Sequence, residues 1–426
     1  MKIDYIGKYK DQFIWLNNNY KFRFNIVTGL YEYKLLRKGR VIKGQEWQDF
    51  DDRTRSDILL RMFNENMDIA DSKLNNYIES NYNSPNYDPF LEYFEDLKEW
   101  ESGDKNYIKE LCETIKTKNP NHLEKSIKKF LVATVACLLE PDEVNDVCLV
   151  FQSSHQGVGK SRWMRRLLPA QFRSRYLYEG AIDTKNKDHT IYLSQYWFMH
   201  LDELETLKGS SIGAIKSYIT RQRISERKSY GRYKSHFLRR ASFLGSVNED
   251  KFLTDITGNR RWIVFQTSHI DYEHLVDIDG VWAQAYFYYK QGFKYWFDNQ
   301  EIKVINEINE EFREMSLEEE ILIKYFGFPE EVDETASDYY YLSTTEVLMK
   351  IQSMNGGILN KMNSSKMGKA LSRHSKIKRM SNGVSKYYLE FSYENEIENK
   401  INTTKGTQKS TEVPSNYYSD DDDIPF

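Results

Sequence analysis

Cysteine and proline are scarce in this chain, and apolar runs long enough to span a bilayer are missing. Its 426 residues include 3 Cys and 8 Pro. Cys112, Cys137 and Cys148 are too few for a disulfide framework and lack metal-ligand spacing, so we expect them in cores. No apolar run reaches the roughly 18 residues of a membrane span, and the first residues lack the apolar core of a signal peptide. We therefore expect a soluble, cytoplasmic protein with no membrane partner.

Aromatic side chains, in contrast, are abundant. The chain has 31 Tyr and 23 Phe, and hydrophobic residues make up 40% of it. This is ample material for buried cores, which excludes a fully disordered chain. At roughly 150 residues per domain, the length predicts about three folded units.

Positive charge is concentrated in two blocks, although the net charge is −4. Residues 216–240 hold nine Lys or Arg and one acid, Glu226, and residues 361–386 hold eight Lys or Arg and no acid. Two such blocks in an acidic protein favour a polyanionic partner, with nucleic acid the first candidate. Either block taken alone is also typical of a solvated surface.

Hydrophobic periodicity predicts how the chain is organised. Residues 12–36 alternate apolar and polar positions, which predicts a β-hairpin or small meander, and residues 47–66 have helical spacing. Residues 80–89 carry two prolines and predict a linker. We expect a small α+β N-terminal domain at residues 1–84, followed by a helical lead-in and an α/β domain at residues 85–300.

The middle of the chain alternates short apolar runs with helical segments. The runs VCLVF, YWFMHL, ASFLGSV and WIVF are typical of strands buried in a parallel sheet. After them, residues 301–392 predict a separate unit of helices followed by a hairpin that turns at Asn382-Gly383, which is the order of a winged helix. Residues 393–426 predict a disordered tail. The predicted fold class is therefore α/β.

A phosphate-binding segment follows the first of these apolar runs. Glycines let a backbone curl until its N–H groups point at phosphate oxygens, and the next helix adds its dipole. Lys160 would reach the β- and γ-phosphates of ATP, and the Ser161 hydroxyl would ligate Mg²⁺. Ser154 stands where the full P-loop pattern has its first glycine. The predicted nucleotide-binding residues are Gln156, Gly157, Val158, Gly159, Lys160 and Ser161.

Two carboxylates follow the apolar run that ends at Leu201. Asp202 would hold Mg²⁺, and Glu203 would orient or deprotonate the attacking water. Glu205 would take that role if the register were shifted, and an acidic helix start is the structural alternative. Asn248, which ends another predicted strand, would hydrogen-bond the γ-phosphate and the water, or would be a cap or turn residue.

Two consecutive arginines precede the last of these strands. Arg260 and Arg261 on a tight turn would offer bidentate contacts to phosphate. In an oligomer, one of them would reach the γ-phosphate of the neighbouring chain as an arginine finger. Surface arginines are common, so the residues alone leave this open.

These motifs, in this order, resemble the virulence-associated protein E family of phages and mobile elements, which is similar to superfamily 3 helicases within the AAA+ P-loop class. The resemblance rests on residues 156–161, 201–204, Lys216 with 230–232, 245–248 and 257–262. Ser154, Ser246 and Val247 depart from the family pattern without removing a phosphate-binding side chain. The resemblance implies an AAA+-like ATPase core that uses ATP and Mg²⁺ at residues 85–300.

The resemblance also gives the first basic block a role. In superfamily 3 proteins the corresponding segment projects a hairpin into a central channel. Basic side chains would follow the phosphates of single-stranded DNA, and aromatic side chains would stack on its bases. The residues predicted to contact DNA are Lys216, Arg227, Lys228, Tyr230, Arg232 and Lys234. The second basic block would approach duplex DNA.

The implied function is an ATP-dependent DNA helicase or translocase that acts in replication of a phage or mobile element as a homo-oligomeric, hexameric ring. The alternative is a DNA-binding ATPase switch that recruits or diverts host replication proteins without unwinding. A small-molecule kinase would leave both basic blocks unexplained.

Four consecutive aspartates stand before Ile-Pro-Phe in the tail. An aspartate run is typical of a solvated tail, but apolar residues beside it gain little unless a partner buries them. The segment resembles the C-terminal tip of bacterial single-stranded DNA-binding proteins, which implies a host replication protein as partner. The residues predicted to bind it are Asp422, Asp423, Ile424, Pro425 and Phe426.

Overall fold

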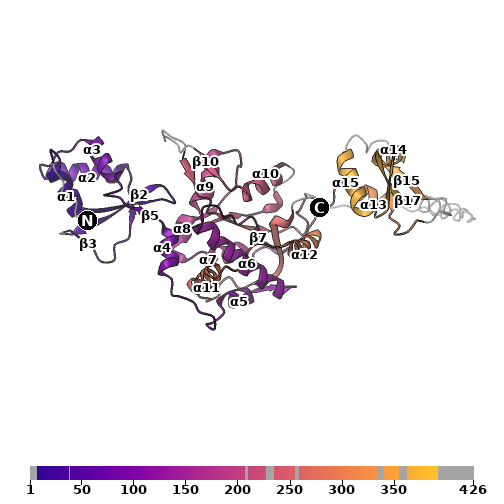
Figure 1. Ribbon diagram of the computed structural model, residues 1–426, viewed down its shortest axis with the longest axis horizontal. Coiled ribbons are helices and arrows are strands. Elements are labelled where there is room, and N and C mark those ends of the chain that lie inside the picture. The colour runs from indigo at the N-terminus through magenta and orange to yellow at the C-terminus, as the bar shows by residue number, and fades with distance from the viewer. Residues whose placement is uncertain are drawn as a thin grey trace, which may run out of the picture. The chain divides into compact units, whose positions relative to one another are not determined.

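The computed structural model describes residues 7–37, 39–206, 210–226, 235–254, 259–332, 339–354 and 362–391. The chain forms two compact units, Met1–Arg313 and Glu314–Phe426 (Figure 1). It is a mixed α/β protein with parallel strands, which confirms this part of the predicted fold class. Within the described ranges, no helix is both long enough and apolar enough to cross a membrane.

The first unit begins with a small sheet, the N-terminal sheet, in which β1 (Tyr20–Asn25) pairs with β2 (Leu30–Arg37) on one side and β5 (Asn86–Tyr87) on the other. β3 (Arg40–Val41) and β4 (Gln48–Asp49) pair with β2. Side chains of α1 (Lys10–Asn19), α2 (Asp52–Asn64) and α3 (Asp71–Ile78) share a core with this sheet.

Two predictions for this region were wrong in part. Residues 12–19 belong to helix α1, because Trp15 and Leu16 are buried against the sheet and tertiary packing outweighs the alternating pattern. The predicted linker at residues 80–89 contributes β5, which extends the sheet as a parallel neighbour of β1.

The central sheet carries the predicted apolar strands. β7 (Cys148–Gln152) lies between β12 (Ser242–Val247) and β13 (Trp262–Ile270) and is parallel to both. β9 (Phe198–Leu201) and β8 (Leu177–Glu179) continue the parallel order beyond β12, and β6 (Ile115–Thr117) pairs antiparallel with β13. Every residue of β7 and β12 is buried, as expected for a parallel sheet covered on both faces.

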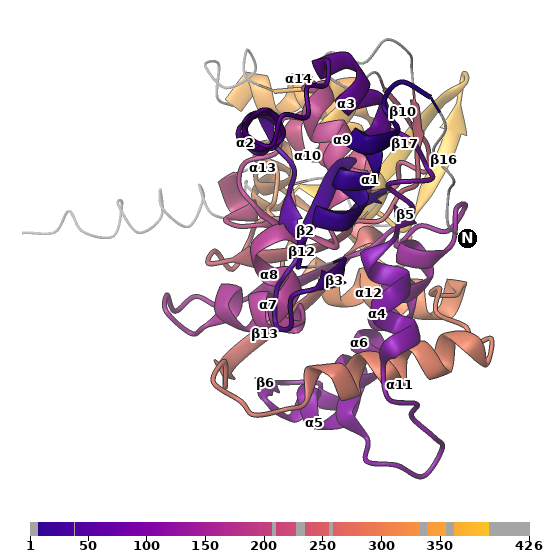
Figure 2. The same cartoon turned by 90° about the vertical axis from the view of Figure 1, so that its left-hand side faces the viewer.

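Helices cover this sheet and bury its aromatic side chains. α5 (Tyr107–Glu113), α6 (Pro120–Leu139) and α11 (Ile278–Lys290) lie together (Figure 2) and share a core with β7. Cys112, Cys137 and Cys148 are free and buried, as predicted. The other elements are α4 (Pro89–Asp96), α7 (Lys160–Leu167), η1 (Ala170–Phe172), α8 (Arg173–Tyr176), α9 (Lys187–Gln195), η2 (Leu204–Thr206), α10 (Ser210–Ile219), β10 (Ile224–Glu226), β11 (Ser235–Phe237), η3 (Asn259–Arg261) and α12 (Asn299–Glu310).

The second unit has its own sheet and its own core. β17 (Val384–Phe391) pairs antiparallel with β14 (Phe326–Gly327), β15 (Tyr339–Ser343) and β16 (Lys378–Ser381). The β16–β17 turn uses Asn382 and Gly383 at φ 50° and 76°, as a hairpin of this type requires. The helices are α13 (Leu317–Tyr325), α14 (Thr344–Met354) and α15 (Ser364–His374).

Candidate nucleotide-binding site

The loop after β7 curls tightly and leads directly into helix α7. Gly157 and Gly159 have φ values of 78° and 95°, in the left-handed region that favours glycine. A Cβ atom on Gly159 would lie 2.1 Å from Cδ1 of Tyr272, so this position also needs a residue without a side chain. Because α7 begins at Lys160, the unpaired N–H groups of its first turn face the same loop.

The side chain of Lys160 lies at the carboxyl edge of the central sheet and is 7% exposed. Its Nζ atom donates hydrogen bonds to Oδ1 of Asn248, at 2.9 Å, and to the carbonyl oxygen of Ser153, at 3.1 Å. Burial lowers the pKa of Lys160, and the nearby carboxylates of Glu205 and Asp202 oppose this shift. The predicted phosphate-binding lysine and the asparagine at the end of β12 are therefore direct neighbours.

Asp202 follows β9 and accepts hydrogen bonds from two hydroxyl groups. Ser161 of α7 donates to its Oδ1 atom at 3.5 Å, and Ser246 of β12 donates to the same oxygen. The predicted Mg²⁺ ligands Ser161 and Asp202 are thus brought together from separate elements.

A buried histidine contacts Ser246, one of the two serines that donate to Asp202. His200 of β9 is 2% exposed, and its Nε2 atom lies 3.2 Å from Oγ of Ser246. Its Nδ1 atom lies 3.5 Å from Oε1 of Glu179, which also accepts a hydrogen bond from Arg165. The hydrogen bonds from His200 and Arg165 lower the pKa of Glu179. This supporting chain was missed from the sequence, where the polar residue inside the apolar run YWFMHL was its signal.

The structure separates the two candidate water-orienting carboxylates. Glu205 of η2 accepts hydrogen bonds through Oε1 from the backbone N–H and the side-chain amide of Asn248, at 3.1 and 3.2 Å. Its Oε2 atom is buried and has no hydrogen-bond partner in the described part of the chain. Glu203 is exposed and has a left-handed backbone, with φ at 52°. Glu205 is therefore the carboxylate in contact with the Lys160–Asn248 pair.

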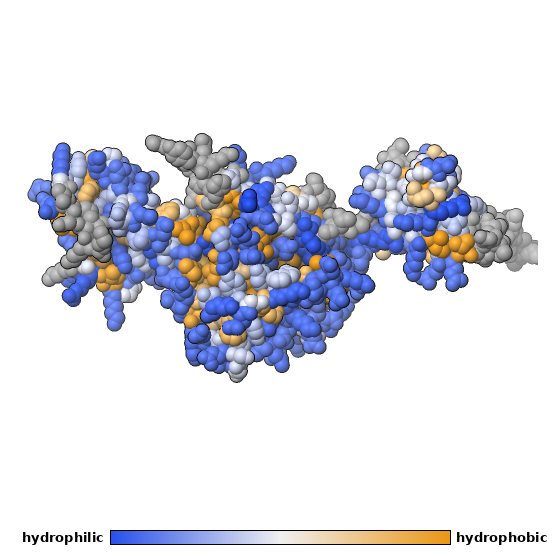
Figure 3. Space-filling model, viewed as in Figure 1, coloured by the Kyte–Doolittle hydropathy of each residue, from blue (hydrophilic) through white to orange (hydrophobic). Residues whose placement is uncertain are grey.

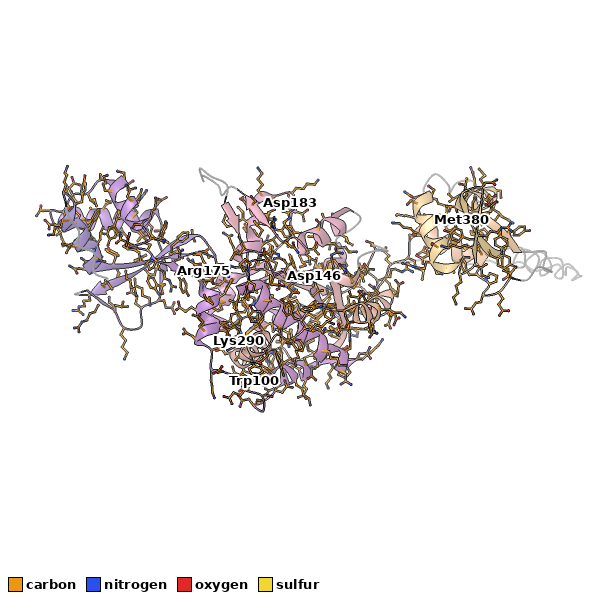
Figure 4. All side chains as sticks on the ribbon, in the orientation of Figure 1. Trp100, Asp146, Arg175, Asp183, Lys290 and Met380 are labelled. Atoms are coloured by element: carbon orange, nitrogen blue, oxygen red, sulfur yellow. The ribbon has the colours of Figure 1, made fainter. Side chains whose placement is uncertain are left out.

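Arg260 and Arg261 lie far from this edge of the sheet. Both belong to η3, which immediately precedes β13. β13 and β7 are parallel and in register, with Trp262 opposite Cys148, so the arginines lie near the amino edge and the loop 153–159 at the carboxyl edge. The five residues of β7 span about 16 Å. The two arginines line a separate cavity of about 450 Å³ together with Asp146, which Figure 4 labels.

Comparison with known proteins identifies the region that holds all these residues. The profile of the virulence-associated protein E-like domain matches residues 94–314. The chain belongs to this family. A search of curated proteins gives no match.

Among solved structures, the chain is similar to the C-terminal region of NrS-1. One match is an apo structure of NrS-1 residues 305–718, with 13% sequence identity and a TM-score of 0.43. The match covers 89% of the present chain and 98% of the NrS-1 chain. An A-form apo structure of the same region is 12% identical, with the same coverage and a TM-score of 0.39.

The remaining predicted residues of this virulence-associated protein E-like protein have different outcomes. Lys216 of α10 is 6% exposed, and its Nζ atom donates to Oδ1 of Asn259 at 3.1 Å. Lys216 thus holds η3, and this burial does not support a direct contact with DNA. Other predicted residues lie outside the described part of the chain; these are Arg227, Lys228, Tyr230, Arg232, Lys234, Asp422, Asp423, Ile424, Pro425 and Phe426.

Proposed function

We propose that this virulence-associated protein E-like protein is an ATP-dependent DNA helicase or translocase that acts in replication of a phage or mobile element. The observation that carries the proposal is the placement of Lys160, Asn248, Ser161 and Asp202 at one edge of a parallel sheet, around a glycine loop that opens a helix. This is the arrangement of side chains that P-loop ATPases use to bind and cleave a nucleoside triphosphate.

The residues present fit ATP with Mg²⁺. The backbone N–H groups of the loop and of α7 would bind phosphate oxygens, with Lys160 as the charged donor. Ser161 and Asp202 would hold Mg²⁺, because this ion prefers oxygen ligands and keeps several waters. Bound Mg²⁺ would neutralise charge on the β- and γ-phosphates.

The pair formed by Glu205 and Asn248 would position the attacking water. Asn248 would bind the γ-phosphate and the water, and Glu205 has a buried oxygen free to accept a hydrogen bond from that water. Glu203 remains the second candidate, because its left-handed backbone is the kind of strained conformation found at functional sites.

The position of the arginines supports the proposal of ring assembly. Arg260 and Arg261 lie near the edge of the sheet opposite the loop 153–159 of the same chain. An arginine finger at this position would serve a neighbouring chain, which supports our proposal of a hexameric ring with sites between subunits. Single-stranded DNA would pass through its channel along the basic residues 227–234.

The second unit would bind duplex DNA as a winged helix. Helix α13, strand β15, helices α14 and α15 and the hairpin β16–β17 follow one another in the order of that fold. Lys366 and Lys369 are exposed on α15, and Lys378 and Arg379 are exposed on β16. These side chains would contact phosphates.

The alternative function is an ATPase switch that recruits host replication proteins without unwinding. The acidic segment ending in Ile-Pro-Phe favours it, since such a segment would dock a basic, apolar pocket of a partner. Pull-down from host lysate with the full chain and with a Phe426 deletion would test that contact.

The deciding experiment is ATP hydrolysis and strand displacement by the full chain, with and without single-stranded DNA. A motor requires turnover that rises with DNA and unwinding that is lost in Lys160→Ala. Rings that bind ATP but never unwind or translocate would refute the helicase proposal. An ATP turnover that stays low with single-stranded DNA, and that controls only whether DNA is bound, would favour the switch.

A further inference from the structure

The N-terminal sheet contains a third basic segment. Residues 20–43 hold seven Lys or Arg and one acid, Glu32. The Glu32 side chain is 1% exposed and forms ion pairs with Arg23, at 2.6 Å, and with Arg175 of α8, at 2.8 Å. Arg175, labelled in Figure 4, belongs to helix α8 and also forms an ion pair with Asp49 of β4. The one acid of this segment is therefore neutralised inside the fold, and the exposed charge is positive.

The two faces of the β1–β2 pair differ sharply. Alternation along the strands directs Tyr20 and Phe22 into the core shared with α1, α2 and α3. Lys21 and Lys34 lie on the opposite face and are direct cross-strand partners. Like charges at such a position destabilise a sheet, so a bound anion between them would relieve the repulsion.

An aromatic side chain lies among these cations. Trp47, just before β4, has the Nζ atoms of Lys21 and Lys34 at 5.8 and 5.2 Å from its ring centroid and Cζ of Arg23 at 4.1 Å. The Arg23 guanidinium also lies 3.3 Å from the ring centroid of Tyr87. Beside them is a cavity of about 640 Å³, which Lys34, Trp47, Tyr87 and Arg175 line together with Glu92 and Asp96 of α4.

We propose that this open face, formed by Lys21, Arg23, Lys34 and Trp47, binds single-stranded DNA. Cations that follow a backbone, combined with an aromatic ring on which a base can stack, are the recognition chemistry of single-stranded nucleic acid. A duplex would offer the phosphates but keep its bases paired. The side of the N-terminal part that Figure 3 shows is mainly hydrophilic. The choice of DNA over RNA rests on the proposed function.

In this arrangement phosphates lie across the Lys21–Lys34 pair and a base stacks on Trp47. The face belongs to the same compact unit as the ATPase residues but not to their site. It would therefore hold the strand independently of ATP.

The test measures binding of a fluorescent 20-nucleotide oligo-dT to the full chain at several salt concentrations. All chains carry Lys160→Ala, so that turnover does not interfere. Trp47→Ala should weaken binding about 5- to 150-fold, and Lys21→Ala with Lys34→Ala should reduce the slope of log affinity against log salt by about 1.4. The control for Trp47→Ala is Phe63→Ala on α2, and the control for the lysine pair is Lys10→Ala with Lys73→Ala, on α1 and α3. These three side chains are exposed on helices, and their removal should change neither the affinity nor the salt slope.

Unchanged affinity and slope in both test variants would overturn the proposal. Equal competition by duplex DNA, or tighter binding of oligo-U, would also overturn it. If Trp47→Ala lowers the melting temperature, the lysine variant decides, since Lys21 is exposed and both lysines keep their backbone pairing.

A further experiment tests DNA binding by this face separately from the proposed ATPase activity. It uses Lys21→Ala with Lys34→Ala in a chain that keeps Lys160. Hydrolysis measured without DNA should stay at the wild-type rate. A chain that binds oligo-dT through this face but never hydrolyses ATP would refute the proposed function and leave this site standing.

Discussion

The ammonium group of Lys160 lies 2.9 Å from Oδ1 of Asn248, and the amide of the same Asn248 donates to Glu205 at 3.2 Å. The three residues come from the start of α7, the end of β12 and the short helix η2. One asparagine thus joins the cation that would bind phosphate to the carboxylate that would orient water. It can serve both because its amide carries an acceptor and a donor.

Replacing Asn248 by Ala should therefore impair hydrolysis more than binding. We expect ATP turnover to fall about 10²- to 10³-fold, as when a positioned donor is removed from a reaction site, while the affinity for ATP changes only a few-fold. Phosphate release and titration with a fluorescent ATP analogue measure the two quantities. Asn64→Ala, at the end of α2, is the control and should match wild type. Wild-type turnover in Asn248→Ala would contradict this role.

The two glutamates after β9 should differ in importance. Glu205→Gln removes a carboxylate whose buried Oε2 atom has no hydrogen-bond partner among the described residues. ATP turnover should therefore fall at least about 100-fold. Glu203→Gln changes an exposed side chain and should lower turnover only a few-fold. Single-turnover hydrolysis with saturating ATP compares them. The reverse order of effects would assign the role to Glu203.

Arg260 and Arg261 should act on the neighbouring subunit. Two variants are compared: one carries Lys160→Ala, and the other carries both Arg260→Ala and Arg261→Ala. We expect neither variant to hydrolyse ATP when it is tested alone. An equimolar mixture should regain about a quarter of wild-type turnover, because randomly mixed rings contain interfaces that combine an intact lysine with an intact arginine pair. Hydrolysis in mixtures of the two purified chains measures this. Inactive mixtures that still assemble would rule out a contribution between subunits.

The continuous apolar runs made the central sheet predictable. The strands β7, β9, β12 and β13 contain runs in which every position except His200 is apolar or small, since parallel strands are buried on both faces. The glycine loop was equally visible, because its geometry requires residues of one type at fixed spacing. Helix α1 was missed, since burial of Trp15 and Leu16 depends on the sheet that follows.

Contacts between segments that are distant along the chain could not be predicted from the sequence. His200 and Glu179 meet because β8 and β9 are neighbours, with Glu179 opposite His200 in the register, and no spacing along the chain encodes this. Lys216 was predicted to contact DNA because it stands in a basic block, yet it is buried and donates a hydrogen bond to Asn259, 43 positions later. The basic face around Trp47 was missed because a hairpin spreads its cations over two strands.

The last prediction concerns the pH dependence of the second unit. Helix α14 begins with a capping box: the Ser343 N–H donates to Oε2 of Glu346 at 2.7 Å, and the Glu346 N–H donates to Oγ of Ser343 at 3.3 Å. Lys386 of β17 adds an ion pair to the same carboxylate at 2.9 Å. The hydrogen bond from the Ser343 backbone, followed by that from Lys386, lowers the pKa of Glu346 to about 2.

Because this pKa is lower in the folded than in the unfolded chain, the carboxylate stabilises the second unit above about pH 4.5, and this stabilisation is lost as the pH falls toward about 2. Glu346→Gln should therefore lower the melting temperature of this unit by at most about 4 °C at pH 7, because solvent screens the partly exposed carboxylate, and the difference from wild type should shrink steadily between pH 5 and pH 3. Calorimetry of the full chain at pH 7, 5 and 3 measures it. Glu320→Gln, at an exposed position of α13 in the same unit, is the control. A difference from wild type that stays constant over this range would show that the ionised carboxylate does not hold the cap.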